Sequence, residues 1–388
     1  MTDVRRSNGR RPRPHGVTGV TRVGWPPSWR GQRAATAFVH QARKQAKGAR
    51  MSSQLPPGPI GLTSVETLAL GAVREACLIA RSLAATIQTT PVVRKADDSP
   101  VTVADFAVQC WIARCLTATE IPLIGEESAE ALAAAGPEML ESVHAALPAG
   151  LRPRHPNELL LWLNRASQVR SAPGGCWWLL DPIDGTKGFL RGGQYAICLA
   201  LVREGTPVFG LLGCPALPQS GIPLGNIGQP AGVLLLGHRS SGAWQSSLSE
   251  AAAWRAIQCS DSGSIGAKIR ICESRDLRHA WRGLLDRSLE RLGVSAAPVR
   301  IDSQCKYALV ARGDAEVYAR LPRDPSYVEK TWDHAAGAVI AQAAGARVSD
   351  LDGLPLDFSR GVALVGRGLL VASPRWHTAL LDALRNAG

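Results

Sequence analysis

Two aspartates three residues apart, Asp181 and Asp184, are the side chains whose type and spacing most clearly suggest chemistry. They follow the apolar run 176–180, which contains two tryptophans and has the composition of a buried strand. Pro182 fixes its own φ and favours an extended backbone at Asp181, so the chain does not coil into a helix there. We therefore expect both carboxylates at the C-terminal end of a strand, where they could hold cations.

The residues after the second aspartate offer hydrogen-bond donors to an anion. Gly185 and Thr186 have backbone N–H groups available, and residues 186–190 are compatible with a short helix whose positive end would face the same position. Cations and a phosphate could therefore share one site. The alternative is a surface turn, for which Asp, Pro and Gly are ordinary choices, but a turn does not need two acids behind two tryptophans.

Neighbouring segments supply the elements that would position these groups. Thr63 and Glu66 have the spacing of a capping box at the start of a long amphipathic helix. Thr102 is placed to cap a second helix, which would orient Asp105 in its first turn. Because Asp105 is fixed in this way, it is a further candidate for the site.

A second acidic pair, Glu126 and Glu127, directly follows the short apolar run 121–124, which predicts another strand. It repeats the arrangement of two acids at a strand end. Asp333 falls in the first turn of a helix predicted over residues 332–344. Taken alone, it would be interpreted as an acid that stabilises the helix.

The length of 388 residues and the 45% hydrophobic content are sufficient for two domains. We expect an N-terminal α+β domain over residues 61–218, with a hairpin turn at 203–206. The Gly- and Pro-containing segment 219–230 predicts a connection to a C-terminal α/β domain over residues 231–388. Strands and helices alternate in that domain, and its first strand is expected at 233–236.

The net charge of +12 belongs to the N-terminal segment, because residues 1–60 contain twelve Lys or Arg and one acid. The near-neutral remainder argues against a nucleic-acid-binding face on the folded part. The composition of residues 1–60 predicts a disordered basic tail or a targeting leader, and Met51 is an alternative start. The protein would then be cytoplasmic or, with a leader, organellar in a plastid or mitochondrion. Nucleic-acid binding by the tail itself is a further alternative.

The nine cysteines show no Cys-x-x-Cys pair and no zinc-type spacing with histidine. We interpret them mostly as core residues in a reducing compartment. No apolar run approaches the ~20 residues that span a bilayer. We therefore expect no membrane association and no stable nucleic-acid partner.

Three separated motifs identify a family. They are Gly-Glu-Glu at 125–127, Asp-Pro-Ile-Asp-Gly-Thr at 181–186 and Trp-Asp-His-Ala-Ala-Gly at 332–337. In this order they resemble the lithium-sensitive, magnesium-dependent phosphatase superfamily of inositol monophosphatase and fructose-1,6-bisphosphatase. Segments 187–192 and 302–307 are most similar to its 3′(2′),5′-bisphosphate nucleotidase branch, which hydrolyses 3′-phosphoadenosine 5′-phosphate. The resemblance implies an α/β protein with α/β/α/β/α layers and a site between its two domains.

The resemblance also implies a metal site for two or three Mg²⁺ ions. Its ligands would be the carboxylates of Glu126, Asp181, Asp184 and Asp333 and the backbone carbonyl of Ile183. The chemistry agrees, since magnesium prefers oxygen ligands. Carboxylates gathered from four places also repel one another unless cations neutralise them. Such ions would stabilise the attacking and leaving oxygens of a phosphoryl group.

The same resemblance gives roles to residues around the metals. Asp105 and Thr186 match the pair that orients and deprotonates a metal-activated water. Substrate would be bound by Gly185, Thr186, Ser303, Lys306 and Arg320. Lysine and arginine suit a 5′-phosphate, although without the resemblance both would be interpreted as surface charges. The binding partner would be a small nucleotide, and we expect a monomer.

One segment departs from the family pattern. Glu273 and Ser274 lead into a short basic stretch in place of a His- and Ser-rich loop, which leaves His279 as a weak candidate for contact with the base. Two alternative functions remain open at this point. One is a phosphatase for inositol monophosphate or inositol polyphosphate 1-phosphate, and the other is a regulatory nucleotide-binding protein without turnover.

Overall fold

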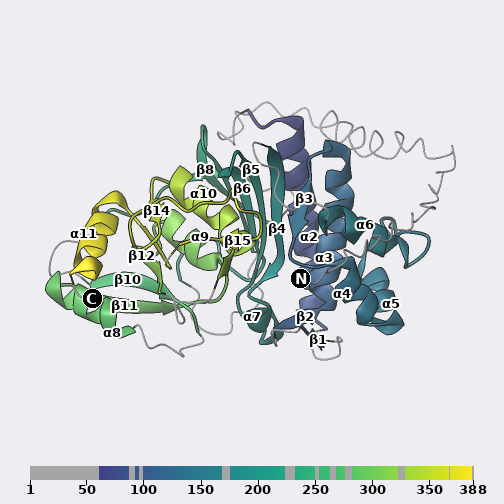
Figure 1. Ribbon diagram of the computed structural model, residues 1–388, viewed down its shortest axis with the longest axis horizontal. Helices are drawn as coiled ribbons and strands as arrows, with labels where there is room; N and C mark the ends of the chain where they lie inside the picture. Colours follow the sequence, from purple (N-terminus) through teal and green to yellow (C-terminus); the bar gives the residue numbers. More distant parts are fainter. Residues whose placement is uncertain are drawn as a thin grey trace, which may run out of the picture. The chain divides into compact units, whose positions relative to one another are not determined.

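The structure is a computed structural model, and it describes ten segments. They are residues 61–86, 92–95, 99–167, 175–222, 232–249, 253–262, 268–275, 282–321, 328–366 and 368–386. The predictions for residues 1–60 lie outside the described residues, as does His279. The described segments form five layers that alternate between helices and sheets (Figure 1).

Two helices form the first layer, α2 (Ser64–Ala84) and α3 (Val103–Leu116). The predicted capping box begins α2, and the predicted cap Thr102 begins α3. The Glu66 N–H donates to Thr63 Oγ1 at 3.2 Å, and the Thr63 N–H donates back to Glu66 Oε2 at 2.8 Å. Thr102 and Asp105 make the equivalent box on α3. The two helices pack against each other and cover one face of the first sheet.

A seven-stranded sheet forms the second layer, in the order β3-β4-β5-β6-β7-β8-β9. Its strands are β3 (Leu123–Gly125), β4 (Cys176–Asp184), β5 (Ala196–Arg203), β6 (Thr206–Cys214), β7 (Val233–His238), β8 (Gly242–Ser247) and β9 (Arg255–Ile257). The predicted apolar strand is β4, on which the buried Trp178 and Trp177 belong to the cores on opposite faces of the sheet. The hairpin turn between β5 and β6 is confirmed, with Glu204 and Gly205 both at positive φ.

The strand expected at 233–236 is present as part of β7, but it belongs to the first sheet. β7 pairs antiparallel with β6, and Cys214 lies opposite Val233. The segment 219–230 therefore leads between two neighbouring strands, although its Gly and Pro content suggested a connection between domains. The first sheet ends at Ile257, well beyond the boundary expected at residue 231.

A second pair of helices, α9 (Cys305–Ala311) and α10 (Ala335–Ala343), forms the third layer. α10 packs on the opposite face of the first sheet from α2 and α3, and α9 also contacts the second sheet. α10 is apolar over its whole length and is buried between the sheets.

The second sheet forms the fourth layer, in the order β11-β10-β12-β16-β14. Its strands are β10 (Lys268–Glu273), β11 (Ser295–Arg300), β12 (Val317–Arg320), β14 (Arg347–Ser349) and β16 (Leu369–Ala372). The outer helices α8 (Arg282–Arg291) and α11 (Pro374–Arg385) form the fifth layer over a third apolar cluster. The α/β/α/β/α arrangement predicted from the sequence is therefore confirmed.

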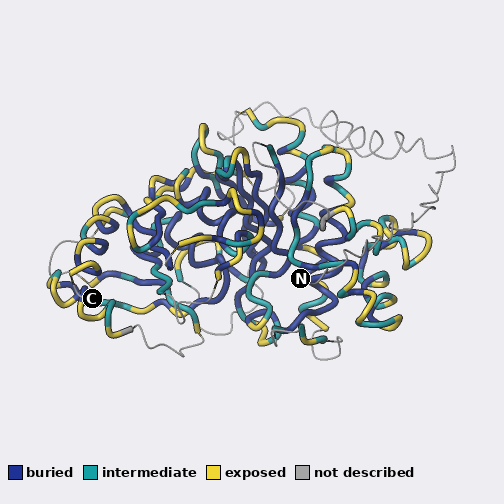
Figure 2. Tube along the Cα trace, in the orientation of Figure 1, coloured by how far each residue is buried: buried dark blue, intermediate teal, exposed yellow. Residues whose placement is uncertain are grey.

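Shorter elements surround these layers. They are β1 (Val92–Arg94), β2 (Pro100–Thr102), η2 (Thr117–Thr119), α4 (Ala129–Ala134), α5 (Pro137–Ala146), α6 (Glu158–Ser167), α7 (Thr186–Leu190), β13 (Glu329–Lys330), η3 (Thr331–Asp333) and β15 (Ala363–Leu364). Figure 2 shows that the central strands and the helices between the sheets are the most buried parts of the chain. All nine cysteines are free thiols and six are buried, which agrees with their interpretation as core residues. Among the described residues, no helix combines the length and apolar character needed to cross a bilayer.

Candidate active site

Two parallel strand ends bring the predicted acidic pairs together. β3 pairs with β4 in parallel, and Gly125 lies opposite Leu180. The next residues along the two strands are Glu126 and Asp181, and the Glu126 N–H donates to the Leu180 carbonyl at 3.2 Å. The two carboxylates therefore lie at the same edge of the first sheet, as expected from the sequence.

Asp184 and Asp333 join these two residues, and we call the four side chains the acidic cluster. Asp184 ends β4, and Asp333 ends the 3₁₀ turn η3, which contacts β4 and β5. Burial raises the pKa of Asp333 well above its usual value, and repulsion by Asp184 raises it further. Burial likewise raises the pKa of Asp181, with added repulsion from Glu126 and Asp184.

The local structure at Asp333 differs from the expectation. The sequence predicted one helix over residues 332–344, with Asp333 in its first turn. His334 has φ −135°, which is far from helical, and it separates η3 from α10. Asp333 therefore precedes α10, so its charge is not explained as a simple stabiliser of that helix.

The acidic cluster fits a bound metal. Asp181 is 2% exposed, and its Oδ1 has no hydrogen-bond partner among the described residues. A buried carboxylate without a partner is strongly unfavourable unless a cation compensates it. All four side chains offer oxygen atoms, which suits a hard divalent cation better than a soft metal.

Asp105 lies beside the cluster with one oxygen occupied. The Thr102 N–H and hydroxyl both donate to Asp105 Oδ2, at 2.8 and 2.6 Å. Asp105 Oδ1 lies 3.4 Å from the Thr186 hydroxyl oxygen, which is also 3.0 Å from the Ile183 carbonyl oxygen. Burial raises the pKa of Asp105 to about 7, so this carboxylate can exchange a proton near neutral pH.

Lys95 is a site residue that the sequence analysis missed. Its Nζ lies 2.6 Å from Glu126 Oε1 and 2.6 Å from Glu127 Oε1. Burial disfavours the charged ammonium, but the two carboxylates outweigh this effect and raise the pKa of Lys95. The only signal in the sequence was its position in a polar loop ahead of the helix that carries Asp105.

Gln109 was also missed, and it fixes the loop that carries Glu126. The Glu127 N–H donates to Gln109 Oε1 at 2.9 Å, and Gln109 Nε2 donates to the Glu127 carbonyl. A Cβ at Gly125 would lie within 2.6 Å of the Gln109 amide, so this contact requires glycine there. Gln109 appeared in the sequence only as one polar residue of an apolar helix.

Two of the predicted substrate-binding residues are buried: Ser303, which lies beside Gly185, and Lys306, which lies on α9. Ser303 is buried and has φ 66°, and the positive φ of Gly185 lets the two residues pack closely, since a Cβ at Gly185 would lie 2.9 Å from Ser303 Cβ. Lys306 lies in the first turn of α9, 6% exposed, with its Nζ 5.5 Å from the centre of the Tyr318 ring. Lys306 is therefore not the surface charge that it would be interpreted as without the family resemblance.

Lys306 and Arg320 both act on Asp184. Burial raises the pKa of Asp184 to about 6, and attraction from Lys306 and Arg320 opposes that rise. Burial lowers the pKa of Lys306, which Asp184 partly offsets. The charges of Lys306 and Arg320 therefore favour the ionised form of Asp184.

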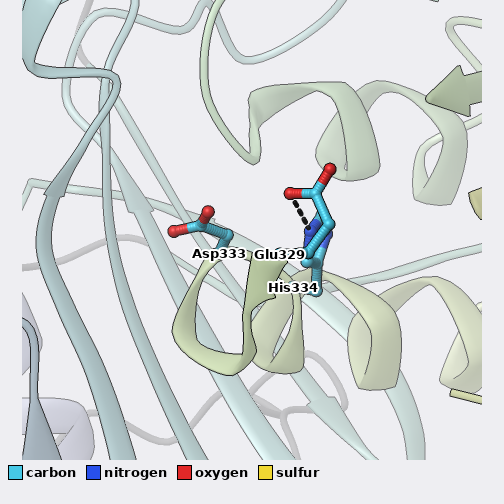
Figure 3. A group of neighbouring side chains, drawn as sticks. All are labelled: Glu329, Asp333 and His334. Carbon is cyan, nitrogen blue, oxygen red and sulfur yellow. Dashed lines mark hydrogen bonds and ion pairs between the residues drawn. The ribbon is translucent and has the colours of Figure 1, made fainter. Parts of the chain in front are cut away.

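Glu329, Asp333 and His334 form a group whose ligand atoms lie within 4.8 Å of one another. Figure 3 shows the Glu329 carboxylate next to the His334 ring, whereas the Asp333 carboxylate extends towards the strands of the first sheet. Glu329 already pairs with Arg320 at 2.7 Å and with His334 Nε2 at 3.3 Å. We therefore assign Glu329 to the ion pair with Arg320 and Asp333 to the acidic cluster.

The chain belongs to the inositol monophosphatase family, whose model matches residues 62–388. Among solved structures it is similar to the extragenic suppressor protein suhB from Bartonella henselae, with a TM-score of 0.57, 18% identity and coverage of 83% of this chain and 99% of that one. CysQ from Bacteroides thetaiotaomicron has a TM-score of 0.52 and 20% identity, and the match covers 79% of this chain and 96% of CysQ. These structures support the fold.

Curated relatives are more similar in sequence. The chain is 37% identical over 338 residues to a 3′(2′),5′-bisphosphate nucleotidase of Oryza sativa, which covers 82% of this chain and 94% of the relative. A 3′(2′),5′-bisphosphate nucleotidase of Dictyostelium discoideum is 33% identical over 333 residues, covering 84% and 98%. The family and branch predicted from the motifs are confirmed.

Proposed function

We propose that this protein is a 3′(2′),5′-bisphosphate nucleotidase that hydrolyses the 3′-phosphate of 3′-phosphoadenosine 5′-phosphate, giving AMP and phosphate. The observation that carries the proposal is the placement of the buried Lys306 in the first turn of α9, two residues after Gln304, whose backbone N–H donates to Asp184 of the acidic cluster. Its ammonium lies over the Tyr318 ring of β12, the strand that ends with Arg320. A monophosphate needs only the cluster, whereas a second phosphate needs cations of its own. The names of the curated relatives support the same substrate class.

The proposed cofactor is Mg²⁺, in two or three ions, held by the acidic cluster and the Ile183 carbonyl. The unpartnered Asp181 Oδ1 and the exclusively oxygen-containing ligand set support this assignment. When bound, the ions would neutralise charge on the transferred phosphoryl group and stabilise the oxygens that enter and leave.

Asp105 is the proposed general base, and Thr186 is its partner. The two hydrogen bonds from Thr102 hold Asp105 Oδ2, which leaves Oδ1 directed at the Thr186 hydroxyl. A water between Oδ1 and the substrate phosphate would lose its proton to Asp105. The Thr186 hydroxyl would orient the same water.

The remaining residues are proposed to bind the two phosphates. Gly185 and Thr186 lead into α7, and their backbone N–H groups would bind the 3′-phosphate. Ser303 would contact the nucleotide from the turn before α9. Lys306 and Arg320 would bind the 5′-phosphate, with Glu329 holding Arg320 Nε.

The decisive experiment measures phosphate release from 3′-phosphoadenosine 5′-phosphate, with and without Mg²⁺, alongside inositol 1-phosphate and adenosine 3′-monophosphate. We expect Mg²⁺-dependent release that is fastest with the bisphosphate and is inhibited by lithium at concentrations where sodium has no effect. Faster release from inositol 1-phosphate would favour the inositol phosphatase alternative. No release from any of the three would favour a regulatory nucleotide-binding protein.

We further propose a monomer that acts on a small nucleotide without a stable nucleic-acid partner. We also propose that the protein is cytoplasmic, or organellar in a plastid or mitochondrion if residues 1–60 act as a leader. Size-exclusion chromatography with light scattering should give a mass near 41.2 kDa for the full chain. A fluorescent fusion of residues 1–60 that entered a plastid or mitochondrion would identify the leader.

A further inference from the structure

Gln304 lies where three elements of the candidate site meet. It directly precedes α9 and is 2% exposed. Its backbone N–H donates to Asp184 Oδ2 at the end of β4. Its side-chain Nε2 donates to the Trp332 carbonyl at 2.9 Å, and its Oε1 accepts from the Gly337 N–H at 2.8 Å. One buried residue therefore contacts β4, η3 and the start of α10.

The side chain of Gln304 also completes the N-terminus of α10. The first N–H groups of a helix lack partners within the helix, and the residue before α10, His334, makes no side-chain capping bond. Gln304 Oε1 satisfies the Gly337 N–H from outside the helix. This contact depends on the glycine, because a Cβ there would lie 2.4 Å from the Tyr307 ring of α9.

The two carboxylates next to these contacts belong to different parts of the chain. Asp184 receives the backbone N–H of Gln304, and Asp333 is the neighbour of the Trp332 carbonyl that its side chain holds. They repel each other when both are charged. Some fixed connection is therefore needed to keep them together before a cation arrives.

We propose that Gln304 is a positioning residue that fixes Asp184 and Asp333 relative to each other, so that the metal site is formed before metal binds. A site that is already formed binds more tightly, because binding does not have to order its ligands. This inference depends on the proposed function only through the assignment of Asp184 and Asp333 as metal ligands, and it does not depend on the substrate.

The test replaces each of two buried glutamines by methionine. Methionine has a similar size but cannot make the hydrogen bonds of the glutamine amide. The first variant is Gln304→Met. The matched control is Gln245→Met, because Gln245 is also 2% exposed and donates to a backbone carbonyl, that of Gln219, at 2.9 Å. Gln245 lies on β8, and its side chain is hydrogen-bonded to Gln219 and Arg312, neither of which belongs to the acidic cluster.

The readout is Mg²⁺ binding to the metal-free protein, measured as the rise in melting temperature over a series of Mg²⁺ concentrations. We expect Gln304→Met to raise the apparent dissociation constant for Mg²⁺ about five- to tenfold, the effect of one or two lost hydrogen bonds. Gln245→Met should lower the melting temperature at every Mg²⁺ concentration equally and leave the dissociation constant unchanged.

Gln304→Asn serves as a second variant, because it keeps the amide on a shorter side chain that cannot reach both partners. If Gln304→Met does not fold, a rise in the dissociation constant for Gln304→Asn supports the proposal and an unchanged one overturns it. Unchanged Mg²⁺ binding in Gln304→Met would overturn the positioning role alone. A wild-type protein that does not bind Mg²⁺ would overturn the proposed function together with this inference.

Discussion

Replacement of Arg320 by alanine tests whether the second sheet binds the 5′-phosphate of the substrate. Arg320 ends β12, and its Nε donates to Glu329 Oε1 at 2.7 Å. If its guanidinium group contacts the 5′-phosphate, the variant Arg320→Ala and a substrate without that phosphate lack the same interaction. The two changes should then cost similar transition-state free energy.

The expected size follows from the exposure of the side chain. A hydrogen bond to a charged group contributes about 1.5–3 kcal/mol. Water screens part of the charge, since the Arg320 side chain is 36% exposed, so we expect a value in the lower half of that range. The specificity constant for 3′-phosphoadenosine 5′-phosphate should therefore fall roughly ten- to fortyfold. Lys306→Ala should cost more, because Lys306 is only 6% exposed.

The assay measures kcat/KM of both proteins with the bisphosphate and with adenosine 3′-monophosphate. Arg320→Ala should reduce kcat/KM for the monophosphate by less than about threefold. The monophosphate already lacks the 5′-phosphate, so removing Arg320 removes no further interaction, and the losses from two partners of one interaction are not additive. The control is Arg270→Ala in β10, since Arg270 is 37% exposed and pairs with Glu316 in the same sheet. Arg270→Ala should change kcat/KM for both substrates by the same factor.

Equal losses for both substrates in Arg320→Ala would refute the reasoning, because the lost contact would then not involve the 5′-phosphate. Equal efficiency of the wild-type protein on the two substrates would refute it more directly. Either result would favour the inositol phosphatase alternative, in which the second sheet binds no second phosphate.

Three further predictions concern the acidic cluster and its neighbours. Asp181→Asn should abolish most activity and the stabilisation by Mg²⁺ while raising the melting temperature of the metal-free protein. Burial and the neighbouring carboxylates make the ionised form of Asp181 unfavourable in the folded state, and asparagine cannot ionise. Full turnover at ordinary Mg²⁺ concentrations would contradict the metal assignment. Thr186→Ala should lower kcat by ~10²–10⁴-fold with little change in Mg²⁺ affinity, and the opposite pattern in a Mg²⁺ titration would make the hydroxyl structural. The metal-free protein should lose stability as pH rises from about 4 to 7, because burial raises the pKa of Asp105 to about 7 and the folded state therefore keeps a proton that the unfolded chain has released. Asp105 alone would contribute on the order of 4 kcal/mol to this loss, and a melting temperature in chelator that rises over this pH range would contradict the prediction.

Sequence reasoning placed correctly those residues whose local structure depends only on their near neighbours in the chain. The capping boxes at Thr63 and Thr102 depend on side chains three residues apart, so their spacing alone predicts the helix starts. The apolar run before Asp181 predicts a strand for the same reason. Once these elements are placed, the acids that follow them must lie at element ends.

The features that were missed depend on pairings between distant residues. Lys95 and Gln109 contact the loop at Glu127 from 32 and 18 residues away, and no local pattern records such contacts. The placement of β7 in the first sheet depends on its pairing with β6, which the Gly and Pro residues between them concealed. The helix predicted over residues 332–344 is interrupted at His334 by a non-helical backbone angle. The surrounding sequence favours helix throughout, so it gives no sign of this interruption.

The short helix α9 connects the metal chemistry to the proposed choice of substrate. Gln304 donates to Asp184 at its start, and Lys306 lies two residues further in its first turn. The separation between the acidic cluster and the buried ammonium is therefore fixed within one turn of one helix. The ammonium of Lys306 also lies 5.5 Å from the centre of the Tyr318 ring on β12, the strand that Arg320 ends, so both cations are held against the same strand. We therefore expect Lys306 and Arg320 together to define the distance between the two phosphates that the site accepts.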